Sequence, residues 1–154
     1  MAAADYATAQ GENVWVGRFD PQRSEEMYRY HVRSDGTLSE VVERVRTPPR
    51  VQGVVVTSRE IVWSQSYGRA AAGAIVVSPR HQPWVPSSQH LTDGQQAARF
   101  IVTPSMAEGL VITGNRLHVV FESCAGKYAA GASEQVCSIQ RGGIPTLPAP
   151  TGRS

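Results

Sequence analysis

The 154-residue sequence has little of several features that identify a partner or a compartment. It has no run of 18 apolar residues, so no membrane-spanning helix is expected. Its net charge is only +2, and its most basic stretch, VVERVRTPPR (41–50), mixes Glu43 with arginines and contains no aromatic residue, so nucleic-acid binding is not expected. The start, MAAADYATAQGE, has Asp5 where a signal peptide needs an apolar segment, and no export signal is apparent in the chain.

Motifs of common catalytic sites are also missing. The four histidines are widely spaced and form no HxH or HxxxH pair, which disfavours a histidine metal site. Ser64, Ser66 and Ser123 lie in no G-x-S-x-G elbow, and GRAAAG lacks the Lys-Ser/Thr ending of a phosphate-binding loop. These absences lean against an enzyme and leave the question of activity open.

Helical periodicity is absent as well, and a repeat takes its place. Apolar residues at i, i+3, i+4 and i+7 are always interrupted by Gly, Pro or β-branched runs. TPPRVQGVVVT (47–57) aligns without a gap with TPSMAEGLVIT (103–113), an offset of 56 residues. DYATAQGENVWVGRF (5–19) aligns with QGVVVTSREIVWSQS (52–66), an offset of 47 residues. The chain therefore contains three copies of one unit.

Each copy predicts a small antiparallel β-sheet. Two apolar runs flank a polar turn, QGEN, TSRE or TGNR, which is typical of a β-hairpin. A third run follows in every copy (27–32, 73–78 and 134–139), and a fourth in the first two (40–46 and 98–103). We expect an all-β fold of about three four-stranded blades of a β-propeller, roughly half a ring. The blades span about 5–50, 51–106 and 107–140, and 141–154 is a Pro/Gly-rich tail.

Two phrases suggest a family. RVQGVVVTSREIVWSQSYGR (50–69) and TPSMAEGLVITGNRLHVVFES (103–123) resemble the closing blades of secreted bacterial six-bladed β-propellers. The resemblance covers Asp5–Ile139 and implies the C-terminal half of a secreted or extracytoplasmic propeller. More distantly, AEGL at Glu108 is similar to the metal-binding strand of the gluconolactonase and senescence-marker group. It implies Glu108 as a metal ligand, although the group's Asn and Asp ligands have no counterpart in this chain.

Three polar residues occupy the same position of the repeat. Asp5, Gln52 and Glu108 stand directly before the repeated apolar run, where the innermost strand of a blade would begin beside the central channel. Their oxygens could hold a divalent cation such as Ca²⁺. The alternative is that they are solvated residues at a wet channel mouth.

Other candidates are single features. Arg69 in SYGR is a candidate anion contact on a loop, or Gly68 there only makes a turn. Cys124 and Cys137 are expected to face each other across predicted strands, as a disulfide or as two free thiols. Trp15, Trp63 and Tyr67 are expected to pack between blades, and Trp84 to be exposed.

Two functions follow as hypotheses. The first is a non-catalytic binding or scaffold module of an exported bacterial protein, and the second is a metal-dependent hydrolase of the lactonase type with Glu108 as ligand. The flat faces of the first and last copies are expected to be apolar. The expected partner is therefore the missing half of the propeller or a second copy of the chain.

Overall fold

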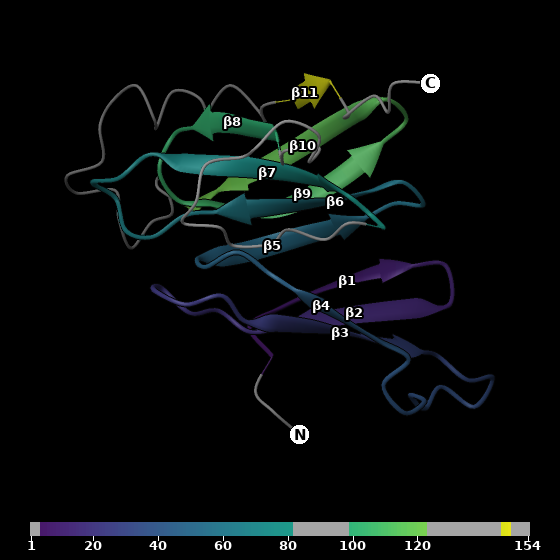
Figure 1. Cartoon of the computed structure of the whole chain (residues 1–154). Helices are drawn as coiled ribbons and strands as arrows, with labels where there is room; N and C mark the ends of the chain where they lie inside the picture. Colours follow the sequence, from purple (N-terminus) through teal and green to yellow (C-terminus); the bar gives the residue numbers. More distant parts are fainter. Residues whose placement is uncertain (1–3, 82–98, 123–145, 149–154) are drawn as a thin grey trace.

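Strands joined by turns and loops make up the part of the chain whose structure is described. The computed structural model describes residues 4–81, 99–122 and 146–148, and these residues form no α-helix (Figure 1). No described helix is long and apolar enough to cross a membrane. The strands are β1 (Tyr6–Gln10), β2 (Asn13–Gly17), β3 (Glu26–His31), β4 (Glu43–Arg46), β5 (Val51–Val56), β6 (Glu60–Gln65), β7 (Gly73–Pro79), β8 (Arg99–Thr103), β9 (Ala107–Thr113), β10 (Arg116–Phe121) and β11 (Thr146–Pro148).

The strands form three antiparallel sheets that follow one another along the chain. Sheet 1 has the order β1-β2-β3-β4 and sheet 2 the order β5-β6-β7-β8, so both are four-stranded meanders. Sheet 3 has the order β11-β10-β9. The all-β prediction of successive blade-like antiparallel sheets is confirmed.

Sheet 3 differs from the expected pattern in its third strand. The run at 134–139, predicted to be that strand, lies outside the described residues. Thr146–Pro148, which the sequence placed in the tail, pairs with β10 instead. β11 ends at Pro148 and is an edge strand of sheet 3, a position where a proline is tolerated because its missing N–H need not donate to a neighbouring strand.

The predicted hairpins have the register that the repeat requires. Tyr6 pairs with Gly17, and Gly53 pairs with Ser64, each position shifted by 47 residues. Gly11 and Gly114 have φ values of 58° and 60° and open two-residue loops, a conformation that favours glycine. In the middle copy the Thr57 hydroxyl closes the turn, accepting from the Glu60 N–H at 2.9 Å.

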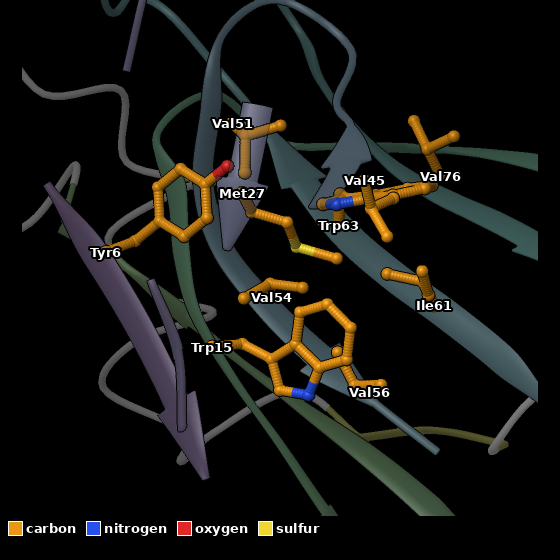
Figure 2. Packing of buried hydrophobic residues seen from close by; sticks show 10 residues of the cluster. All are labelled: Tyr6, Trp15, Met27, Val45, Val51, Val54, Val56, Ile61, Trp63 and Val76. Atoms are coloured by element: carbon orange, nitrogen blue, oxygen red, sulfur yellow. The ribbon is translucent and has the colours of Figure 1, made fainter. Parts of the chain in front are cut away.

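The middle sheet is buried on both faces, which joins the three sheets into one stack. Alternate residues of β6 point to opposite sides, because side chains alternate along a strand. One cluster joins sheet 2 to sheet 1 and contains Trp15, Met27, Val45, Val54, Val56, Ile61, Trp63 and Val76 (Figure 2). The other joins sheet 2 to sheet 3 and contains Val62, Ile75, Val77, Leu117, Val119 and Phe121.

The first strands of the sheets lie beside one another. β1 contacts β5, and β5 in turn contacts β9. At Gly53 the approach of β9 is so close that a Cβ would lie 2.2 Å from the Glu108 carbonyl oxygen. Ser64 donates a hydrogen bond to the same carbonyl, and Ser66 donates to the Ala107 carbonyl at 2.9 Å. Sheets 2 and 3 are therefore joined through backbone acceptors as well as through apolar side chains.

Candidate functional site

The three polar residues of the repeat lie at corresponding ends of neighbouring strands. Asp5 directly precedes β1, Gln52 is the second residue of β5, and Glu108 is the second residue of β9. The pairing register shifts at Gln52, and again where Glu108 and Gly109 pass β10, so β5 and β9 both carry a bulge. A bulge bends a strand and redirects a side chain. The repeat thus places these residues alike on β1, β5 and β9.

Two of these side chains have matching local partners. The Phe19 N–H donates to Asp5 Oδ2 at 2.8 Å, and Gln52 Nε2 donates to the Ser66 carbonyl at 3.3 Å. Phe19 and Ser66 are themselves 47 residues apart, as Asp5 and Gln52 are. Each bond ties the start of a first strand to a residue within two positions of the end of the second strand. The polar position of the repeat therefore has a structural role in at least two copies.

The backbone conformation of the residue before the inner strand also repeats, although no sequence signal indicates it. Arg50 and Met106 are 56 residues apart and have φ values of 63° and 61°, which is uncommon for residues other than glycine. The Arg50 carbonyl accepts from the Ser66 N–H at 3.0 Å, and the Met106 carbonyl accepts from the Glu122 N–H at 3.0 Å. Because two copies share this left-handed conformation at equivalent positions, the conformation belongs to the architecture and does not by itself mark a site.

The predicted divalent-cation site remains a prediction. Asp5 and Glu108 are carboxylates and Gln52 is an amide, so the three side chains offer hard oxygen ligands with two negative charges. Within residues 4–81, 99–122 and 146–148, no group of three or more His, Cys, Asp or Glu side chains is placed to hold a metal ion. One oxygen of Asp5 already accepts the Phe19 N–H.

An arginine and two aromatic rings lie close together at the end of the sheets where Asp5 and Gln52 lie. Tyr67 lies in the loop after β6, and its side chain is 54% exposed, so the expectation that it packs between blades is wrong. Its ring centroid is 6.0 Å from that of Phe19 and 5.9 Å from the Arg50 guanidinium carbon. Arg50 Nε donates to the Pro21 carbonyl at 2.9 Å, which holds the guanidinium over the ring. We call Phe19, Arg50 and Tyr67 the loop-end cluster.

Arg69 lies two residues beyond the exposed tyrosine, in the same loop. Gly68 between them has φ 72°, so the turn depends on a conformation that favours glycine. The Arg69 side chain is half-buried and takes part in an interaction of its own. Its role as an anion contact stays a prediction.

An ion-pair network between sheets 1 and 2 was missed by the sequence reading. Arg80 donates to Glu43 Oε1 at 2.5 Å and to Oε2 at 2.6 Å, and Arg29 Nε donates to Oε2 at 2.9 Å. The Arg80 guanidinium carbon is 4.8 Å from the centroid of the buried Trp15 ring. The hydrogen bonds from Arg80, aided by both positive charges, hold the pKa of Glu43 below its ordinary value against partial desolvation. No sequence spacing predicts this network, because its members come from three strands or loops.

Other predicted residues divide between confirmed and undescribed ones. Trp15 and Trp63 are fully buried in the cluster between sheets 1 and 2, as expected (Figure 2). Trp84, Cys124 and Cys137 lie outside the described residues, so an exposed tryptophan and a disulfide stay predictions.

Comparison with known proteins assigns no family to this arrangement. No family model, no curated protein and no solved structure matches the chain. Its function is therefore argued from its own geometry.

Proposed function

We propose that the chain is a non-catalytic part of a β-propeller that serves as a binding or scaffold module of an exported bacterial protein. The observation that carries this proposal is the middle sheet, which buries one face on each neighbour while β5 lies beside both β1 and β9. A propeller needs this arrangement, because each blade covers the next and first strands surround a central channel. The ring is completed by the missing half or by a second copy.

The loop-end cluster is the proposed binding surface. Loops between stacked strands tolerate variation while the sheets hold them rigidly, and binding residues concentrate on such loops. Arg50 offers a cation beside the exposed Tyr67 ring, and Arg69 lies in the same loop as Tyr67. A guanidinium beside an aromatic face suits a ligand with a carboxylate and an apolar side. We therefore propose an acidic oligosaccharide or a similar organic anion as the class of ligand.

A binding measurement with polygalacturonate tests this surface, with neutral dextran as the comparison. The proposal predicts binding to the acidic polymer that falls at least about tenfold in Tyr67→Ala and in Arg50→Ala. Phe100→Ala, at an exposed phenylalanine of β8 outside the loop-end cluster, is the matched control and keeps the affinity. Equal affinity in all four proteins, or no preference over dextran, would contradict the proposed surface.

A metal-dependent hydrolase of the lactonase type is the second candidate. It is favoured by the AEGL phrase and by the place of Glu108 at the start of the inner strand of sheet 3. The test is a thermal-shift titration with Ca²⁺, Mn²⁺ and Zn²⁺, together with a lactone-hydrolysis assay. The non-catalytic proposal predicts no rise in melting temperature and no turnover. A rise in melting temperature with turnover, both lost in Glu108→Gln, would establish the hydrolase instead.

A further inference from the structure

The same positions of the repeat face the preceding sheet in both sheet 2 and sheet 3. In sheet 2, Val54, Val56, Ile61 and Trp63 pack toward sheet 1. The residues 56 positions later are Leu110, Ile112, Leu117 and Val119, and these pack toward sheet 2. The same positions of the repeat therefore contact the preceding sheet in both cases. We call this side of a sheet its upstream face, and the opposite side its downstream face.

Sheet 1 has an upstream face too. The corresponding residues, 47 positions before those of sheet 2, are Ala7, Ala9, Val14 and Val16. Val14 pairs with Tyr30, and Val16 pairs with Tyr28, so two aromatic rings extend the same surface. The alanines are exposed and the other four side chains are partly exposed. No sheet formed by the described residues covers this apolar surface.

The downstream face of sheet 3 also has exposed apolar residues. Val55 and Val62 of sheet 2 face sheet 3, and their equivalents 56 residues later are Val111 and His118. Val120 lies on the same side, because it stands between Val119 and Phe121, which face sheet 2, and side chains alternate along a strand. Val111 and Val120 are each 48% exposed.

We propose that the upstream face of sheet 1 binds the downstream face of sheet 3 in a second copy of the chain. Within one chain, each covered upstream face packs against the downstream face of the preceding sheet. A second copy would supply a downstream face for the uncovered face of sheet 1 and an upstream face for the uncovered face of sheet 3. Two copies joined head to tail through two such contacts would place six described sheets in one closed assembly. This is within the range of roughly four to eight blades for propellers. The inference rests on the proposed propeller architecture, and the partner it names is a second copy of the chain.

Sedimentation velocity of the full chain, from low to high micromolar concentration, tests this proposal. The expected species contains two chains of 16.7 kDa each. Val16→Glu and Val120→Glu should each raise the dissociation constant at least about tenfold, because a carboxylate would be buried without a partner in both contacts. Ala7→Glu, at an exposed position beside Val16, is the second variant should Val16→Glu fail to fold. Val102→Glu, an exposed valine of β8 in sheet 2 and therefore outside both faces, is the matched control.

Mixing the two variants identifies which faces meet. An equimolar mixture of Val16→Glu and Val120→Glu retains one unaltered contact in each mixed pair, so it should associate more strongly than either variant alone. A dimer that Val120→Glu leaves intact would overturn the head-to-tail arrangement, because the downstream face of sheet 3 would then lie outside the contact. A monomer at every concentration, or a mass that grows without limit, would overturn pairing by copies. None of these outcomes affects the binding and metal tests of the proposed function.

Discussion

Single residues decide how closely the sheets approach, and Gly53 has the most demanding position. Its backbone lies against the Glu108 carbonyl of the next sheet, where a Cβ would have only 2.2 Å. The equivalent residue of sheet 3, Gly109, would place a Cβ no closer than 3.7 Å to Val120, which is ordinary contact. Close packing therefore requires a glycine at this repeat position in sheet 2 but not in sheet 3.

Gly53→Ala is therefore expected to lower the free energy of unfolding by about 2 kcal/mol or more, because backbone must move to admit the methyl group. Gly109→Ala is the matched control and should change it by less than about 1 kcal/mol. Chemical denaturation of the two variants measures both values. Equal stability of the two variants would show that sheets 2 and 3 are not this close at Gly53.

Glu43 links sheets 1 and 2 at the residue scale, and its effect depends on pH. Its pKa is lowered in the folded chain, chiefly by hydrogen bonds from Arg80. A lowered folded pKa means that its contribution to stability is present above the unfolded pKa and is lost as pH falls through the folded pKa. Glu43→Gln should cost about 2 kcal/mol at neutral pH, since the arginines lose a charged acceptor.

The measurement is the free energy of unfolding against pH, from neutral to acid, for both proteins. The difference between wild type and Glu43→Gln should shrink as the pH falls below the ordinary range of a glutamate. Asp20 and Asp35 also have lowered pKa values, through hydrogen bonds from nearby residues, and they remain in both proteins as internal controls. A difference that stays constant with pH would contradict the ion-pair network.

At the scale of elements, the outer strands of sheets 1 and 2 differ sharply. β4 has Glu43, Arg44 and Arg46 on its edge, and charges protect an edge strand from pairing with other chains. β8 has Phe100, Ile101 and Val102 in succession, and Val102 is 78% exposed. The β8 edge is thus the less protected of the two.

Val102→Lys is expected to slow aggregation on warming below the melting temperature, with less than about 0.5 kcal/mol change in stability. Light scattering over time measures the rate. Val42→Lys, an exposed valine in the loop before β4, is the matched control and should aggregate like wild type. The same rate in both variants would exclude the β8 edge as the site of aggregation.

Elements were also what the sequence predicted best. Alternating apolar runs and glycine-containing turns placed β1–β2, β5–β6 and β9–β10 correctly, because hairpins depend on neighbouring residues. The repeat further placed Asp5, Gln52 and Glu108 at equivalent positions. The Glu43–Arg80 pair and the Tyr67–Arg50 contact were beyond prediction, because they join loops and strands whose separation only the stacked sheets determine. The burial predicted for Tyr67 is wrong, because an aromatic residue that follows an apolar strand can point into the core or into solvent, depending on the direction of the loop.

At the scale of the whole molecule, stability depends on sheet 2, which both other sheets require. A small antiparallel sheet cannot bury two apolar faces alone, so repeated sheets cover one another. Sheets 1 and 3 each cover one face of sheet 2, and their own outer faces retain apolar residues such as Val16 and Val120. A stack with this polarity can be extended at both ends, which connects the fold to the proposed assembly.

The most direct test of the stack is a set of nuclear Overhauser effects from methyl groups and indole rings of successive β6 residues. The account predicts contacts from Ile61 and Trp63 to sheet 1 side chains such as Met27, and contacts from Val62 to Leu117 and Val119 of sheet 3. If Ile61, Val62 and Trp63 show contacts to only one neighbouring sheet, or to none, the three sheets are not stacked in chain order and the propeller interpretation is wrong.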